Sequence, residues 1–491
     1  MDDVRGPAIA AAASDTCKPD ATRQIAAHVA RLRYEDLPTE LVQMLKQCVL
    51  DTIGVSIAAS TLAPEAKSLH AYVQATGGVC SDASLWGFGG RAPAGLAVFL
   101  NASLGHMVDY DDVGAGGHLS IATIPVAIAL AQQRKPVSGR ALITALAAGF
   151  DVHTRLNQAI RLPDWTIAEG WFPTQLFGYL SGTSTAARLL GFDSGAVENA
   201  FGIAFNQMAG SRQMAVGAAT HMRSMQAGFS GQASVLSVDL TTAGIVGSRE
   251  VLEGRYGLFR TYIRTEPDWD AMLSGLGKEF PVMGVHGFKV WPACGYTRAP
   301  NASIHSLRAR HGIKADDVRR VSIIGGTGGT RLLCEPLENK RRPKLAIDAK
   351  FSIPYTCAVM LARGTVTLSD YTDEALLDPR ILAIADKFDY RDDPGSVLPV
   401  GGYSSLSRPT VEIEMADGRV FRERAAGMPG DPDNPVAQVD LNAKFRDCVR
   451  FSAQPISGAN ANRVIELIGD LENQDDVGSI VELLTRSAAQ H

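Results

Sequence analysis

The stretch from His106 to Ala131 decides how this chain folds, and its sequence is HMVDYDDVGAGGHLSIATIPVAIALA. Its first thirteen residues hold three aspartates and two histidines, and a Gly-Ala-Gly-Gly sequence divides them. The residues that follow are almost wholly apolar, which predicts a buried helix. We therefore expect a cleft lined by ionisable groups above a helix of the core, with the glycines forming a hinge between them.

The spacing of the ionisable residues indicates which of them share a face. If the preceding helix continues through Asp109, then His106 and Asp109 are neighbours, because residues three apart in a helix lie side by side. Asp112 would continue that face, whereas Asp111 would point elsewhere. The glycine hinge would then bring His118 to the same place. A carboxylate can orient an imidazole and stabilise its charge, so we expect Asp109 and His118 to transfer protons near neutral pH.

Two other interpretations of this stretch are weaker or remain open. A calcium loop would place Asp109, Asp111 and Gly114 at its first, third and sixth positions. Val113 and Ser120 then occupy its fifth and twelfth positions, where carboxylates or similar ligands are needed. A zinc site would need more His or Cys at close spacing. An acidic helix end at the protein surface fits the spacing as well as a catalytic cleft does.

The segments around this stretch have helical periodicity. Residues 39–60 repeat their apolar positions with a period near 3.6, as amphipathic helices do. Similar segments are rich in Ala, Gly and Ser, and several are apolar on all sides, which favours closely packed central helices. These segments are residues 92–110, 138–156, 174–192 and 194–210.

The pattern changes in the second half of the chain. Residues 318–326 and 409–426 alternate in polarity and contain β-branched residues, and Ala-Asp-Gly at 416–418 predicts a hairpin turn. Helical patterns lie between them, and they return after the Pro- and Gly-rich segment 427–435. We therefore predict a mainly α protein with a large all-α helical domain (17–283), an inserted smaller α+β lid domain (284–434), and C-terminal helices (435–491) that complete the helical domain.

Composition narrows the possible partners and location. The net charge is −5, and Lys and Arg are scattered, so nucleic acid is not an expected partner. The amino terminus lacks the features of a signal peptide, and no apolar run approaches the roughly 20 residues of a membrane helix. The seven cysteines are widely spaced, without any Cys-x-x-Cys pair. We expect a cytoplasmic protein with reduced, mostly buried thiols and no membrane partner.

Two further segments carry cations among small or apolar residues. GVHGFKVWPACGYTRAP (284–300) contains Lys289, Tyr296 and Arg298. A desolvated lysine can act as an acid or base, and an arginine can hold a carboxylate through its planar fork. His221 and Arg223 precede a long apolar segment. The alternatives are a loop with solvated cations in the first case and a helix cap in the second.

Two common catalytic motifs are absent from the sequence. IIGGTGGT (323–330) matches neither Gly-x-Gly-x-x-Gly nor the P-loop, because Thr327 and Arg331 occupy glycine positions and no Gly-Lys-Ser/Thr follows. It is more typical of a glycine turn after a strand. No serine lies in a Gly-x-Ser-x-Gly elbow, so a serine hydrolase is not supported.

With these segments in view, the chain resembles the MmgE/PrpD family over nearly its whole length. The similarity rests on NASLGHMVDYDDVGAGGHLSIATIPVAIALA, GWFPTQLFGYLSGTSTAARLLGF, FKVWPACGYTRAP and DAKFSIPYTCAVMLARG, which occur in this order. The family includes 2-methylcitrate dehydratases, cis-aconitate decarboxylases and iminodisuccinate epimerases. The resemblance implies a helical domain with an inserted lid, a homodimer, and no metal or organic cofactor. It also implies a site for small di- or tricarboxylates between helical domain and lid.

The resemblance assigns three catalytic residues. Asp109 matches the first Asp of the family's Asp-x-Asp-Asp element, His118 matches the histidine after it, and Lys289 matches the lysine that opens the lid segment. The gap between Asp109 and His118 is one residue shorter than in the family pattern. Binding of an anionic substrate would be retained, while the proton-transfer groups are altered.

Three positions depart from the family pattern. Phe172 replaces the histidine of Gly-Trp-His, Arg223 replaces a lysine before the long helix, and Arg298 replaces a histidine at the end of the lid segment. Arginine keeps the positive charge but does not readily exchange a proton. Loss of the Gly-Trp-His histidine weakens the standard dehydratase or decarboxylase arrangement without excluding a lyase.

We therefore expect a cofactor-independent lyase or isomerase that removes a proton α to a carboxylate. His118, oriented by Asp109, is the predicted base, and Lys289 is the predicted acid or charge stabiliser. The predicted substrate-binding residues are His106, Phe172, Arg223, Tyr296 and Arg298. Two alternatives remain: an epimerase of the iminodisuccinate type, and a non-catalytic homologue that binds carboxylates.

Overall fold

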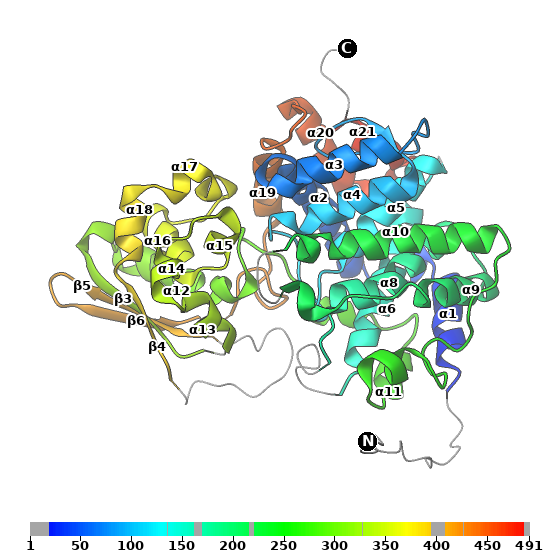
Figure 1. Ribbon diagram of the computed structural model, residues 1–491, viewed down its shortest axis with the longest axis horizontal. Helices are drawn as coiled ribbons and strands as arrows, with labels where there is room; N and C mark the ends of the chain where they lie inside the picture. Colours follow the sequence, from blue (N-terminus) through cyan, green and yellow to red (C-terminus); the bar gives the residue numbers. More distant parts are fainter. Residues whose placement is uncertain are drawn as a thin grey trace, which may run out of the picture.

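The computed structural model describes residues 19–134, 136–161, 169–215, 220–326, 328–393, 408–425 and 427–485. Thr327 and both ends of the predicted helical domain, 17–18 and 486–491, lie outside these ranges. The described residues form a large helical part and a smaller part with a four-stranded sheet, each around its own hydrophobic core (Figure 1). The predicted fold class, mainly α with a smaller α+β domain, is confirmed. The exact domain boundaries stay a prediction.

Helix α2 (Thr39–Leu62) runs through the core of the helical part. Its sequence is apolar on nearly all sides, and 17 of its 24 residues are buried. Among the described helices it alone is long and apolar enough to cross a membrane, yet 83 % of its most apolar window is buried inside the protein. Such burial is expected of a core helix.

Five further helices build the same core, and three of them, α4, α5 and α6, contact α2 directly. Helix α10 packs against α4 and α8, and α8 also packs against α5 and α6. Glycines permit this close packing, because a Cβ atom at Gly178 or Gly182 would collide with Ser230 or Ser234 of α10. The bounds of these helices are Ala94–Met107 (α4), Ser120–Gln133 (α5), Gly139–Gln158 (α6), Pro173–Leu189 (α8) and Met222–Thr242 (α10).

The C-terminal helices pack against the first core. Helices α19 and α20 pack against α2, and α21 packs against α5. Their bounds, with those of the other helices and short strands of this part, are Ala21–Arg31 (α1), Pro64–Thr76 (α3), Ala83–Ser84 (β1), Arg91–Ala92 (β2), Ser194–Phe205 (α9), Trp269–Leu273 (α11), Gln438–Val449 (α19), Gly458–Gly469 (α20) and Gly478–Glu482 (α21).

The smaller part is built on a sheet with the strand order β4-β3-β5-β6. Strands β3 (Val318–Ile324) and β4 (Phe388–Arg391) are parallel, and the other neighbours are antiparallel. The predicted hairpin joins β5 (Thr410–Met415) to β6 (Val420–Arg424), and Gly418 adopts the positive φ of 87° that its turn requires. Both predicted strand segments are therefore confirmed.

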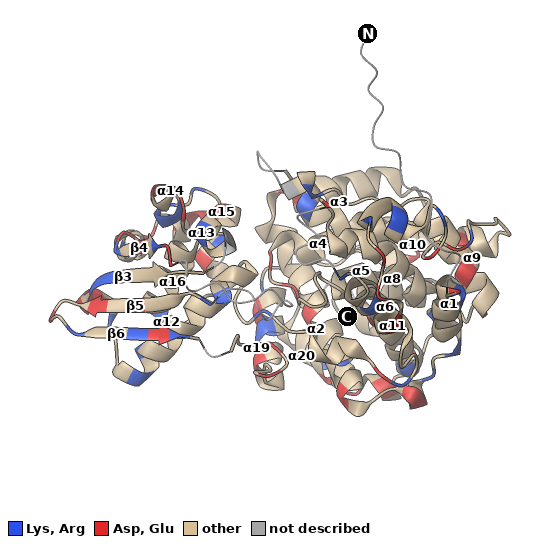
Figure 2. Cartoon of the chain, turned by 90° about the horizontal axis from the view of Figure 1, so that it is seen from below, with Lys and Arg blue, Asp and Glu red and all other residues tan. Residues whose placement is uncertain are grey.

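Helices pack against this sheet, mainly α12 (Arg298–His311), which contacts β5, β6 and α16. The others are α13 (Gly328–Cys334), α14 (Leu337–Arg341), α15 (Ala346–Lys350), α16 (Ile353–Arg363), α17 (Asp373–Leu376) and α18 (Pro379–Ala385). Figure 2 shows acidic and basic residues interspersed along the chain in both parts of the molecule. The six described cysteines are free, and all but Cys80 are buried.

Candidate active site

A short pairing between two loops brings the predicted catalytic residues together. Val113 exchanges two backbone hydrogen bonds with Gly287, at 2.9 and 2.8 Å. This pairing places the loop after α4 beside the segment that contains Lys289. Within the first loop, Gly114 and Gly117 bond to each other across a tight turn in which Gly116 has a φ of 77°. The turn is the predicted glycine hinge, and it leads directly to His118.

Asp109 lies outside helix α4, which ends at Met107. The predicted continuation of the helix through Asp109 is therefore wrong, and Asp109 has a left-handed φ of 52°. This conformation turns both its carbonyl and its carboxylate toward Lys289, whose Nζ lies 2.9 Å from the first and 2.5 Å from the second. Burial opposes ionisation of Asp109, but the charges of Lys289 and Arg223 outweigh it and lower the pKa of the carboxyl group.

Asp111 is the carboxylate that holds the histidines. Its Oδ2 lies 3.0 Å from Nδ1 of His106 and 2.8 Å from Nδ1 of His118. The predicted pairing of Asp109 with His118 is thus wrong, because the early end of α4 turns Asp111 inward and leaves Asp109 to Lys289. Burial opposes the charge of Asp111, but the two imidazoles outweigh it and lower its pKa well below the usual range.

The contacts of the two histidines fix their tautomers. Nδ1 of His118 also lies 2.8 Å from the backbone carbonyl of Asp112, so both of its neighbours are acceptors and Nδ1 must carry the hydrogen. The same argument applies to His106, since Nδ1 faces Asp111. In each ring Nε2 is left to exchange a proton. The side chain of His118 is 11 % exposed and that of His106 only 3 %, and burial lowers the pKa of His106.

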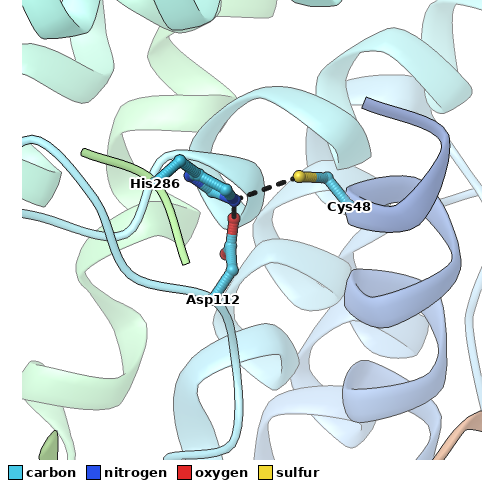
Figure 3. Close-up of side chains that lie close together, drawn as sticks. All are labelled: Cys48, Asp112 and His286. Carbon is cyan, nitrogen blue, oxygen red and sulfur yellow. Dashed lines mark hydrogen bonds and ion pairs between the residues drawn. The ribbon is translucent and has the colours of Figure 1, made fainter. Parts of the chain in front are cut away.

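Asp112 contacts side chains of two other segments, and one of these, His286, also contacts Cys48 (Figure 3). Its Oδ2 lies 3.0 Å from Nε2 of His286 and accepts a hydrogen bond from Ser120. The same Nε2 lies 3.2 Å from Sγ of Cys48, on α2. These buried contacts fix the Asp112 backbone, whose carbonyl contacts His118. The sequence analysis missed Cys48 and His286, because no local pattern pairs residues 238 positions apart.

Two clusters have the residue types of a metal site. Cys48, Asp112 and His286 form one, and His106, Asp111 and His118 form the other, each with its ligand atoms within 4.8 Å of one another. Burial raises the pKa of the Cys48 thiol well above its ordinary value, so the thiolate that metals bind is disfavoured. In the second cluster the distances from Asp111 to His106 and from Asp111 to His118 are those of hydrogen bonds. The predicted independence from cofactors stays a prediction.

Arg223 lies near the start of α10 and close to the carboxylate loop. It is half-buried, its guanidinium lies 4.6 Å from the ring centroid of Phe351, and its Nε is buried without a hydrogen-bond partner in the described part of the chain. Its charge contributes to the lowered pKa values of Asp109 and His106. The position fits the predicted role in binding an anion.

Arg298 and Tyr296 lie at the start of α12. Nη2 of Arg298 donates hydrogen bonds to the carbonyl of Pro429 at 2.6 Å and to Asp431 at 2.7 Å. This guanidinium thus braces the loop that bonds to Phe288, while its Nε is buried without a hydrogen-bond partner among the described residues and is available to a substrate carboxylate. Tyr296 is half-buried, and its backbone faces the thiol of Cys294.

Phe172 precedes helix α8, whose first turn abuts the glycine hinge. Oγ1 of Thr174 accepts a hydrogen bond of 3.0 Å from the backbone N–H of His118. The Phe172 ring is half-buried and lies 5.3 Å from the guanidinium of Arg212. The structure therefore places an aromatic ring, at the position of the family's histidine, two residues from a group that touches His118.

Another buried histidine beside the hinge, His153, should make the protein acid-sensitive. Burial lowers the pKa of His153 on α6 to about 3, and neither ring nitrogen has a hydrogen-bond partner among the described residues. In the unfolded chain the His153 imidazole becomes protonated below about pH 6.5, whereas in the folded protein it stays neutral until about pH 3. His153 therefore lowers the free energy of unfolding as pH falls from about 6.5 toward 3. Between pH 7 and pH 5 the cost is about 2 kcal/mol.

We therefore expect His153→Leu to reduce the loss of stability between pH 7 and pH 5 by about 2 kcal/mol. Urea unfolding of both proteins at the two pH values measures the difference. The comparison uses only the change with pH, so any constant effect of the substitution on packing cancels. An equal loss in both proteins would contradict a neutral His153.

Comparisons with known proteins agree with this architecture. The model of the MmgE/PrpD N-terminal domain matches residues 23–270, and that of the MmgE/PrpD C-terminal domain matches residues 291–469. A cis-aconitate decarboxylase of Aspergillus terreus is 24 % identical over 96 % of this chain and 97 % of its own length. A human cis-aconitate decarboxylase is 23 % identical over 94 % of each chain. The chain belongs to the MmgE/PrpD family.

Proposed function

We propose that this protein is a lyase that removes carbon dioxide from a small unsaturated polycarboxylate of the cis-aconitate kind. One observation carries the proposal: Asp111 holds His106 and His118 by Nδ1, so that Nε2 of each ring can exchange a proton beside the Asp109–Lys289 pair. A proton-transfer group next to buried cations is what carbon–carbon bond cleavage beside a carboxylate needs. The relatives named as cis-aconitate decarboxylases support this choice.

In the proposed reaction the cations hold the carboxylates and His118 moves the proton. The bond from carbon to the departing carboxylate breaks, its electron pair stays on carbon, and carbon dioxide leaves. Protonated Nε2 of His118 then gives its proton to that carbon, and solvent restores it. Asp111 stabilises the imidazolium before the transfer and keeps Nδ1 protonated after it. Lys289 and Arg223 stabilise negative charge on the substrate.

Dehydration is the second candidate. Burial lowers the pKa of His106, so this imidazole is unprotonated at neutral pH and suits the role of base. A base removes the proton beside a carboxylate, and a protonated His118 could donate to the departing hydroxyl. The aromatic ring at Phe172 favours a substrate with one end less polar than citrate in either reaction.

Proton NMR in D2O separates these reactions. The purified protein is incubated with cis-aconitate, 2-methylcitrate, citrate and iminodisuccinate, one at a time. A product lacking one carboxylate and carrying one deuterium supports decarboxylation, and loss of water supports dehydration. Deuterium at an α carbon with the skeleton intact points to an epimerase. If the protein binds these acids but changes none of them, the protein is a carboxylate-binding homologue without catalysis.

A further inference from the structure

Lys350 is a buried cation for which the described residues offer no acceptor. It ends helix α15, and only 3 % of the residue is exposed. No hydrogen bond or ion pair joins its Nζ to a described residue, and the ring centroid of Tyr371 lies 5.3 Å from it. Burying an ammonium group without an acceptor costs free energy, so some other gain must explain it.

Lys350 belongs to the surroundings of the candidate active site. Burial lowers the pKa of its ammonium group to about 8, and the charges of Asp109, which raises that pKa, and Lys289, which lowers it, also act on it. Its backbone carbonyl accepts a hydrogen bond from Cys294, in the segment that follows Lys289. Figure 1 shows α15 on the side of the smaller part that faces the helical part.

Two cations at this point have no carboxylate bound to them, although Glu65, which contacts His221 and Ser224, acts on Lys350 from a distance. Asp109 is paired with Lys289, and Asp111 with two histidines. Lys350 and Arg223 are not ion-paired with any described carboxylate. Their positive charges are therefore left for an anion that enters the site from solution.

We propose that Nζ of Lys350 binds one carboxylate of the substrate, and that a second carboxylate lies toward Arg223. The inference rests on the proposed function, since it assumes that the site takes a small polycarboxylate. It adds a binding residue that the sequence analysis does not single out. It assigns one substrate carboxylate to each of the two cations, which lie on different elements, α15 and α10.

Binding of propane-1,2,3-tricarboxylate, measured by calorimetry, tests the inference without depending on turnover. We expect Lys350→Met to bind it about 10- to 100-fold more weakly than the unaltered protein, the usual range for losing a charge-assisted hydrogen bond. Lys350→Arg keeps the charge and should recover most of the affinity. Lys344→Met is the matched control, because Lys344 is an exposed lysine of the same segment.

Stability provides a second readout that a merely structural lysine would not give. Methionine fills the same space without a charge, so Lys350→Met should unfold at a temperature equal to or above that of the unaltered protein. Equal affinity in Lys350→Met and the unaltered protein would overturn the role of Lys350 and leave the proposed function standing. Failure of the unaltered protein to bind or convert any polycarboxylate would overturn both.

Discussion

Replacing His118 by asparagine should lower turnover about 100- to 10,000-fold, the usual contribution of a group that transfers a proton to or from the reacting carbon. The substitution removes Nε2, the atom that is proposed to transfer the proton. The asparagine side-chain amide can still donate to Asp111 and to the Asp112 carbonyl, which now contact Nδ1 at 2.8 Å each. The buried carboxylate therefore keeps a donor, and the loop should keep its shape. Affinity for a non-reacting polycarboxylate should change little, so the loss should appear in kcat.

His311→Asn is the matched control for this substitution. His311 is exposed at the end of α12 and stacks on Phe421 in the smaller part. The control variant should turn over substrate at the unaltered rate. Circular dichroism and thermal unfolding establish that both variants fold. A folded His118→Asn protein with normal kcat would refute the assignment of His118 and shift the role to His106.

The sequence predicts elements whose pattern is local. The alternation in 409–426, with its Asp-Gly turn, is sufficient to predict the β5–β6 hairpin, and the apolar periodicity of 39–60 is sufficient to predict α2. Each of these elements buries one face or all faces against the core, so its period is fixed by the burial that stabilises it.

Sequence patterns do not predict those contacts of the site that depend on the backbone conformation of a single residue. Asp109, Asp111 and Asp112 are all within reach of His118, and the choice among them depends on where α4 ends. The helix stops at Met107 because Asp109 gains two contacts with Lys289, which comes from 180 residues away. Helical periodicity cannot contain that information. For the same reason, local sequence patterns do not identify Cys48, His286 and Lys350 as residues of the site.

Lys289→Met should destabilise the protein by about 3 to 5 kcal/mol, because it leaves the buried carboxylate of Asp109 without its partner. Lys289 is 1 % exposed, and its Nζ lies 2.5 Å from Oδ1 of Asp109. It also bonds to the Asp109 carbonyl, at a residue held with a φ of 52°. Both contacts disappear together in the variant. Urea unfolding at neutral pH measures the loss.

In the Lys289→Met variant, the contribution of Asp109 to stability should depend on pH with the opposite sign. In the unaltered protein the pKa of Asp109 is lowered, so its contribution to stability is present above about pH 4 and is lost as pH falls through the folded pKa. Without Lys289, burial should raise that pKa above the unfolded value. The variant should then regain stability relative to the unaltered protein as pH falls.

The double variant Asp109→Asn/Lys289→Met separates the structural role of the pair from its chemical role. Asparagine removes the unpaired charge, so stability should recover by more than half of the loss caused by Lys289→Met alone. Turnover should not recover, since the cation that stabilises charge on the substrate is still missing. If the double variant regains both stability and turnover, Lys289 serves only to neutralise Asp109. If it regains neither, the buried charge of Asp109 is not the cause of the loss, and the fixed backbone at this position is.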